Sequence, residues 1–138
     1  MIGSRRMSIA YIGLGSNLGD RRANLDRALQ EIAAAGIKVA AVSKYLESEP
    51  YGVTDQPKFI NAVARLETDL APEPLLDVLL GIENKMGRVR RRHWGERNID
   101  LDLLLYDDVV MHTEKLTLPH PDMHNRDFVM LPLAEVKI

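Results

Sequence analysis

The segment 59–68 constrains the fold most, because its side chains alternate in character along its whole length. Successive side chains of a β-strand point to opposite faces of the sheet. One face would carry Ile60, Ala62, Ala64 and Leu66, and the other would carry Phe59, Asn61, Val63, Arg65 and Glu67. The segment therefore predicts a strand with one apolar face directed at a core.

Helical patterns lie on both sides of this strand. Residues 21–35 and 72–86 carry apolar side chains at helical spacing. Asp20 is a suitable N-cap for the first helix, and Pro72 is typical of the first turn of the second. Glycines follow both segments, at the position where glycine commonly ends a helix.

Three further apolar segments, 9–14, 37–46 and 99–106, indicate strands. The order is then strand, helix, strand, strand, helix, strand, which is the ferredoxin-like βαββαβ order. We therefore predict an α+β fold with a mixed, mostly antiparallel sheet and both helices on one face.

The C-terminal part would add a short strand at 109–111 and a short helix at 126–134, disturbed by Pro132. The whole chain has 138 residues, a length that fits one domain. We expect a single catalytic domain at 7–138, preceded by a flexible extension at 1–6.

Composition narrows the function. The chain has no cysteine, which excludes disulfides, thiolate zinc sites and cysteine nucleophiles and fits a reducing cytoplasm. Its net charge of −2 gives no general attraction to nucleic acid or to an anionic membrane. No apolar run approaches the roughly 18 residues of a membrane span. We expect a cytoplasmic protein without nucleic-acid or membrane partners, a monomer with a weak dimer as the alternative.

Asp100 and Asp102 are the first candidate site. Two apart in a strand, they share one face, while Ile99, Leu101, Leu103 and Leu105 would form an apolar face opposite. Two adjacent carboxylates repel each other unless a cation lies between them, and Mg²⁺ accepts such oxygen ligands together with phosphates and water. A solvated strand face, or Asp–Arg ion pairs, are the alternatives.

An arginine-rich segment, 87–97, directly precedes this strand. Arginine side chains match phosphate oxygens through paired hydrogen bonds, and Trp94 could cover a bound ligand. Carboxylates and arginines together suit a metal–polyphosphate substrate such as ATP. A solvated basic loop or an RNA contact would use the same residues.

Three other groups of residues are candidates for ligand binding. His120 lies between two prolines and close to Arg126, so it could bind phosphate or be an ordinary surface histidine. Phe59 and Phe128, with Asn61, could stack on a flat heterocycle or simply be core residues. The glycine-rich segment 13–19 holds no Walker-type phosphate loop, and its part that follows the strand 9–14, residues 15–20, would form a strand-to-helix turn or a mobile lid.

Several motifs together resemble one family of folate biosynthesis, the 6-hydroxymethyl-7,8-dihydropterin pyrophosphokinases. They are Tyr-Ile-Gly-Leu-Gly-Ser-Asn-Leu-Gly from Tyr11, Gln56-Pro57 with Phe59-Ile60-Asn61, Gly87-Arg88-Val89-Arg90, Trp94-Gly95-Glu96-Arg97-Asn98-Ile99-Asp100-Leu101-Asp102, and Leu118-Pro119-His120-Pro121-Asp122-Met123 with Arg126 and Phe128. The resemblance runs from about Met7 to the end of the chain.

The resemblance implies transfer of pyrophosphate from ATP to the hydroxymethyl group of the pterin, with release of AMP. It implies two Mg²⁺ ions held by Asp100 and Asp102, and Asp102, Arg88 and Arg97 as the catalytic residues. The implied nucleotide-binding residues are Glu83, Arg88, Arg90, Arg91, Trp94, Arg97, Leu103, Thr117, His120 and Arg126.

The implied pterin-binding residues are Ser48, Tyr51, Gly52, Phe59, Asn61, Asp100 and Phe128. Two residues depart from the family pattern near the adenine, Leu80 and Pro121, and many members continue beyond the equivalent of Ile138.

Two other classes of function share this topology. An RNA-binding module would use the arginine segment, but would want aromatic residues on central strands and a basic surface. Aromatic residues are 5% of this chain, and its net charge is negative. A small-molecule-sensing domain would not need paired aspartates beside arginines.

Overall fold

A computed structural model describes residues 7–49, 57–87 and 98–138. The elements in chain order are β1 (Ser8–Ser16), α1 (Arg21–Ala34), β2 (Lys38–Val42), β3 (Leu46–Ser48), β4 (Phe59–Thr68), α2 (Pro72–Lys85), β5 (Asp100–Tyr106), β6 (Met111–His112), β7 (Thr117–Leu118), a 3₁₀ turn (Met123–Asn125) and α3 (Asp127–Val136).

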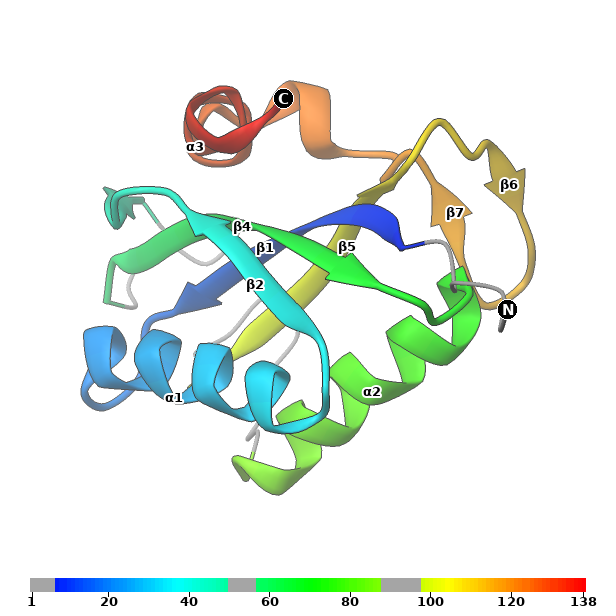
Figure 1. The fold of residues 1–138 in the computed structure, drawn as a ribbon. Helices are drawn as coiled ribbons and strands as arrows, with labels where there is room; N and C mark the ends of the chain where they lie inside the picture. The colour runs from blue at the N-terminus through cyan, green and yellow to red at the C-terminus, as the bar shows by residue number, and fades with distance from the viewer. Residues whose placement is uncertain (1–6, 50–56, 88–97) are drawn as a thin grey trace.

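The main sheet has the strand order β2-β4-β1-β5, and β3 also pairs with β4. Leaving out β3, this is the order of a ferredoxin-like βαββαβ core. Every pairing within the described residues is antiparallel. Helices α1 and α2 cover one face of the sheet, and α3 lies across the other (Figure 1). The predicted α+β class is therefore confirmed.

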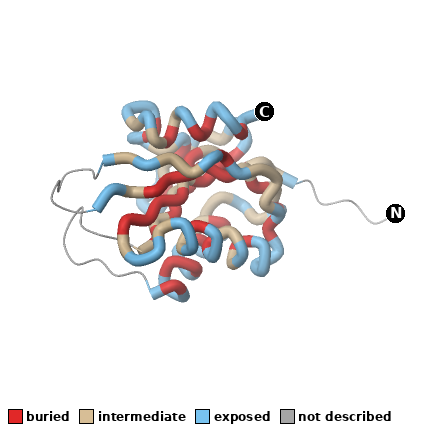
Figure 2. The backbone as a smooth tube through the Cα atoms, turned by 90° about the vertical axis from the view of Figure 1, so that its left-hand side faces the viewer, coloured by how far each residue is buried: buried red, intermediate tan, exposed pale blue. Residues whose placement is uncertain are grey.

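The main core lies between the sheet and helices α1 and α2. The alternation in β4 places its small and branched side chains in this core, as the sequence predicts. They meet buried residues of both helices, which give the inner red zone of the tube in Figure 2. The helix contributions are Leu25, Ala28 and Ile32 from α1 and Leu75, Leu79 and Ile82 from α2.

Local signals explain where the two helices begin and end. The Asp20 carboxylate accepts a hydrogen bond from the Ala23 backbone N–H, which caps α1. Pro72 occupies the first turn of α2, where no backbone donor is needed. Gly36 and Gly87 follow the helices with φ of 87° and 72°, a left-handed conformation that favours glycine.

A second core lies between the opposite face of the sheet and α3. Its sheet residues are Tyr11, Val63 and Leu104, and α3 adds Val129, Leu133 and Val136. The helix runs through Pro132 to Val136, two residues beyond the predicted end, so the proline does not stop it. This layer matters for function because it holds the first residues of α3 over the sheet.

The predicted strand 37–46 is wrong as a single element, because it divides into β2 and β3. Between them, Ser43 pairs with Val63 twice: its N–H donates to the Val63 carbonyl, and its Oγ accepts from the Val63 N–H, both at 2.9 Å. A register shift between Val39 and Ala41 already bends β2 against β4.

The alternation predicted for β5 is correct for Leu101 and Leu103 and wrong for Leu105. The pairing with β1 shifts between Tyr11 and Ile12, so Leu104 is an extra residue in β5. Leu104 belongs to the second core, and Leu105 packs against it instead of facing the main core. A one-residue bulge reverses the faces beyond it.

The predicted strand at 109–111 is displaced. It appears as β6, which pairs with β7 in a separate two-stranded sheet. His120 then attaches this hairpin to β5, because its N–H donates to the Leu104 carbonyl at 2.9 Å. Within the residues that the structure describes, no helix is long and apolar enough to cross a membrane. The predicted extension 1–6 lies outside the described residues.

Candidate active site

Polar side chains of β4 and β5 lie on either side of β1 in the sheet. Gly15 of β1 pairs with Asn61 of β4 on one side and with Asp100 of β5 on the other. Gly13 likewise pairs with Val63 and Asp102. The two aspartates therefore stand beside a strip of β1 that carries no side chains, and both are partly exposed.

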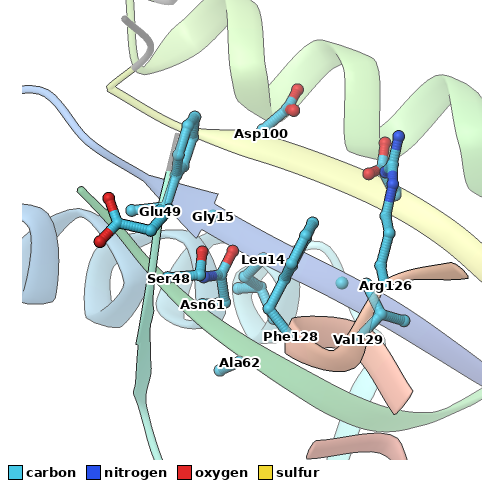
Figure 3. Close-up of a pocket in the computed structure, with 13 residues that line it drawn as sticks. Leu14, Gly15, Ser48, Glu49, Asn61, Ala62, Asp100, Arg126, Phe128 and Val129 are labelled. Carbon is cyan, nitrogen blue, oxygen red and sulfur yellow. The ribbon is translucent and has the colours of Figure 1, made fainter. Parts of the chain in front are cut away.

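A pocket opens over this strip, and we call it the aromatic pocket. Ser48 and Asn61 lie at one end of it, Arg126 lies at the other, and the Phe128 side chain stands between them in the view of Figure 3. The walls come from β3, β4, β5 and the start of α3. The full set of lining residues is Gly13, Leu14, Gly15, Ser48, Glu49, Phe59, Asn61, Ala62, Asp100, Asp102, Arg126, Phe128 and Val129.

Asn61 is oriented by its neighbours. It is 6% exposed, and its Nδ2 donates to Ser48 Oγ at 2.6 Å and to the Leu46 carbonyl at 3.2 Å. Because a carbonyl only accepts, these bonds fix which end of the amide carries nitrogen. Asn61 Oδ1 therefore remains on the side of Gly15 and the pocket.

A second, wider hollow lies between α2, β5 and the β6–β7 hairpin, and we call it the hairpin groove. It shares Asp100, Asp102 and Arg126 with the aromatic pocket. Its other lining residues are Leu76, Leu80, Glu83, Leu101, Leu103, Thr113, Glu114, Lys115, Leu116, Thr117, His120, Pro121 and Asp122. The paired aspartates thus lie where the two hollows meet.

Glu83 of α2 holds β5, the strand that carries the two aspartates, in place. It is 3% exposed, and its Oε2 accepts a hydrogen bond from the Leu101 N–H at 2.7 Å. Leu101 lies between the two aspartates in the chain, so a carboxylate of α2 fixes the backbone that carries them. Glu83 is therefore both a groove residue and a positioning contact.

His120 and Arg126 bring basic groups to the same junction. Burial, and next the positive charge of Arg126, hold the pKa of His120 below its ordinary value. His120 Nδ1 accepts from the Asp122 N–H at 3.3 Å, so in the neutral ring the proton is on Nε2. The Arg126 guanidinium lies 3.7 Å from Asp122 Oδ2 and 5.8 Å from the Phe128 ring centre.

The chemistry of Asp100 and Asp102 fits a hard divalent cation. Among the described residues, no group of three or more His, Cys, Asp or Glu side chains could hold a metal ion. A carboxylate pair is nevertheless sufficient for Mg²⁺, which commonly keeps water and substrate phosphates as its other ligands. The pair fits a metal that arrives with a polyphosphate better than it fits a metal held by protein alone.

Every predicted site residue that the structure describes lines one of the two hollows. The aromatic pocket gathers Ser48, Phe59, Asn61 and Phe128, and the groove gathers Glu83, Leu103, Thr117 and His120. Seven predicted site residues lie outside the described residues: Tyr51, Gly52, Arg88, Arg90, Arg91, Trp94 and Arg97.

Sequence reasoning missed the contribution of Gly13 and Gly15. Gly13 lies in β1, as the predicted strand 9–14 requires, but the turn or lid expected for 15–20 is wrong for Gly15, which also lies inside β1; both glycines line the pocket. Their signal was the glycine-x-glycine spacing, which puts two missing side chains on one face of a strand. Glu49 and Lys115 were also missed, and no local pattern marks either one.

An antiparallel α+β domain with two hollows that meet at a carboxylate pair fits an enzyme that transfers a group between two substrates. The protein-family model described as 7,8-dihydro-6-hydroxymethylpterin-pyrophosphokinase (HPPK) matches residues 11–138. The chain belongs to this family.

Curated relatives agree. All three that follow are called 2-amino-4-hydroxy-6-hydroxymethyldihydropteridine pyrophosphokinase. The protein of Haemophilus influenzae is 50% identical over 94% of this chain and 82% of its own length. That of Methylorubrum extorquens is 47% identical over 94% and 83%. That of Bacillus subtilis is 44% identical over 94% and 78%. Family membership makes the chain a pyrophosphokinase that acts on hydroxymethyldihydropterin in folate biosynthesis, with ATP as co-substrate.

Proposed function

We propose that the aromatic pocket binds the pterin ring, that the hairpin groove binds ATP, and that pyrophosphate is transferred where the two hollows meet. The observation that carries this assignment is that both hollows share Asp100, Asp102 and Arg126. A transfer reaction needs its two substrates in contact at one point, next to the groups that neutralise phosphate charge.

The pterin assignment rests on the character of the aromatic pocket. Phe59 and Phe128 offer ring faces to a flat heterocycle, and the Asn61 oxygen offers an acceptor to its N–H groups. Ser48 holds that amide in place. A ring bound in this way would direct its hydroxymethyl group toward Asp100 and Asp102.

The nucleotide assignment rests on the groove. Thr117, Leu103 and Glu83 line it between the hairpin and α2, and would contact the nucleoside part of ATP. The His120 Nε2–H and the Arg126 guanidinium would donate to triphosphate oxygens, as charge-assisted donors do. Arg88, Arg90, Arg91, Trp94 and Arg97 are proposed to act with them, although they lie outside the described residues.

Asp100 and Asp102 are proposed to hold two Mg²⁺ ions together with the triphosphate. Bound Mg²⁺ supplies neutralisation of the charge that develops on the phosphate oxygens. Asp102 is further proposed to accept the proton of the hydroxymethyl group as its oxygen attacks the β-phosphorus and AMP departs. Arg88 and Arg97 are the other proposed catalytic residues. Such a reaction depends mainly on positioning and charge neutralisation.

The proposed setting is the cytoplasm. The absence of cysteine fits that reducing compartment, and the net charge of −2 gives no general attraction to nucleic acid or to a membrane. We propose a monomer, with at most a weak dimer.

The direct test incubates the full chain with ATP, Mg²⁺ and 6-hydroxymethyl-7,8-dihydropterin and follows the nucleotide products. AMP should form only when all three are present. A chelator should abolish turnover, and added Mg²⁺ should restore it. ADP as the product would indicate an ordinary kinase instead. AMP formation that continues at full rate in excess chelator would overturn the metal assignment.

A further inference from the structure

The backbone conformation of Gly15 in β1 does not require glycine. The glycines with positive φ in the described residues are Gly19, Gly36 and Gly87, so Gly15 has a conformation that any residue can adopt. It lies well inside β1, where glycine weakens a strand relative to residues with a side chain. The advantage of glycine at this position is therefore the space that a side chain would otherwise fill.

That space belongs to the aromatic pocket. A Cβ atom on Gly15 would lie 3.3 Å from Asn61 Oδ1 and 3.5 Å from Cδ1 of Phe59. A separation of 3.3 Å is tight for a carbon and an amide oxygen, so one of the two atoms would have to move. The added methyl group would project between two side chains that line the pocket.

Asn61 cannot easily retreat from such a methyl group. Its amide is almost fully buried and is fixed by hydrogen bonds to Ser48 Oγ and the Leu46 carbonyl. Moving Oδ1 away from β1 would turn the amide and strain or break these bonds. Leaving a buried amide without one of its partners costs free energy. The added methyl group would therefore either make the pocket shallower or turn the Asn61 amide.

Gly13 provides an internal comparison on the same strand. A Cβ there would lie 3.7 Å and 3.8 Å from the two methyl carbons of Leu104 and 4.0 Å from Asp102 Cβ. These are ordinary van der Waals separations. The steric restriction is therefore specific to Gly15.

We propose that Gly15 is a specificity-determining residue that forms the floor of the pterin site. Its missing side chain leaves room for a flat bicyclic heterocycle between Asn61 and Asp100, and keeps the Asn61 oxygen aimed at the ring. The inference rests on the proposed assignment of the aromatic pocket to the pterin. It predicts that the ATP side, which Gly15 does not line, is unaffected by a change at this position.

The test is Gly15→Ala in the full chain, with Gly81→Ala as the matched control. Gly81 lies in α2 with nothing within 4 Å of its added Cβ and lines neither hollow. Gly15→Ala should raise the KM for the pterin about tenfold or more, because one misplaced methyl group in a fitted site has an effect of this size. ATP affinity should stay close to wild type, and the thermal midpoint should fall by only a few degrees, because strain at the buried Asn61 amide also costs stability. Gly13→Ala should have a smaller effect on the pterin KM.

Asn61→Ala and Phe128→Ala separate this inference from the pocket assignment. If both leave the pterin KM unchanged, the assignment itself fails. If both raise it and a folded Gly15→Ala does not, the role of Gly15 alone is overturned.

The double variant Gly15→Ala/Asn61→Ala tests the route of the effect. With the Asn61 amide gone, the Gly15→Ala penalty on KM should shrink, and a penalty of the same size would contradict a role through Asn61. A Gly15→Ala chain that does not fold unless Asn61 is also truncated would show that the contact serves the fold, which would equally overturn the proposal.

Discussion

At the scale of single residues, the molecule concentrates charge on one short stretch of β5. Asp100→Asn and Asp102→Asn keep the shape of each side chain and remove its charge. Each should lower kcat by roughly two orders of magnitude or more, because electrostatic contributions of this kind are worth several kcal/mol. Steady-state kinetics at saturating Mg²⁺ and ATP measure the effect.

The same two variants should leave the fold intact. The buried core residues of β5 are Leu101, Leu103, Leu104 and Tyr106, while both aspartates are partly exposed at the junction of the two hollows. Thermal unfolding and far-ultraviolet circular dichroism should therefore resemble wild type. Near-normal turnover in both variants would refute the metal-binding role.

His120 makes stability depend on pH. Its folded-state pKa lies below the ordinary value of about 6.5. His120 therefore binds a proton more readily in the unfolded chain than in the folded chain. Its contribution to the free energy of unfolding is complete above about pH 6.5 and is lost as the pH falls. Wild type should lose more free energy of unfolding between pH 7.5 and pH 5 than His120→Asn does.

His120→Asn is a suitable comparison because its amide oxygen can replace Nδ1 as acceptor for the Asp122 N–H. Urea unfolding of both proteins at the two pH values gives the difference directly, with the other titrating groups common to both. Equal pH dependence in the two chains would show that His120 is not perturbed in the folded state.

The sequence predicted which candidate residues share a strand face where a local rule applies. The period of two placed Asp100 with Asp102 and Phe59 with Asn61. The role of Gly15 could not be read in the same way, because it depends on β1 lying between β4 and β5 in one particular register. The register depends on how all the strands pair, so the sequence of one strand alone does not predict it.

At the scale of elements, α3 holds one wall of the aromatic pocket and is itself anchored at its C-terminal end. Arg65 of β4 donates to the Val136 carbonyl at 2.6 Å, where a helix leaves carbonyls without partners. Arg65→Met keeps the aliphatic stem and removes the donor. It should cost about 1.5–3 kcal/mol of stability, the usual range for a hydrogen bond that involves a charged group.

Amide hydrogen exchange should show where the Arg65→Met effect falls, with the last turn of α3 exchanging faster than in wild type. Lys38→Met is the control. Lys38 is exposed on β2, and its pair with Glu67 spans 3.7 Å, an arrangement worth about 0–1 kcal/mol. If the two substitutions cost the same, the anchoring of α3 by Arg65 is not significant.

Helix boundaries were predictable where capping residues mark them, and the alternation of β4 gave its limits, 59–68, as observed. Asp20, Pro72 and the two left-handed glycines fixed the limits of α1 and α2. The division between β2 and β3 and the bulge at Leu104 depend on pairing with β4 and β1. A partner strand that is distant in sequence decided both features, so neither the apolar run 37–46 nor the leucines of β5 could reveal them.

At the scale of the whole molecule, two cores share one sheet. The main core contains Tyr106 and Leu79, and the second contains Tyr11 and Leu133. Because β1, β4 and β5 contribute to both, neither core can lose its packing without exposing the strands of the other. The described residues should therefore unfold as one cooperative unit.

Leu79→Ala and Leu133→Ala test this cooperativity. Each should cost roughly 2–5 kcal/mol, as truncation of a buried leucine does, and each should move the entire transition. Far-ultraviolet and near-ultraviolet circular dichroism should report the same midpoint in both variants. Separate transitions for backbone and tyrosine signals would instead divide the predicted single domain into two folding units.

The attachment of the hairpin to β5 has a consequence for timing. The His120 N–H bonds to the Leu104 carbonyl at the bulge, and His120 lines the hairpin groove and not the aromatic pocket. A hairpin of two short strands opens more readily than the central sheet. We therefore expect the hairpin wall of the groove to open locally more often than the sheet beneath the aromatic pocket. The exchange rate of the His120 amide should report this opening without any substrate bound.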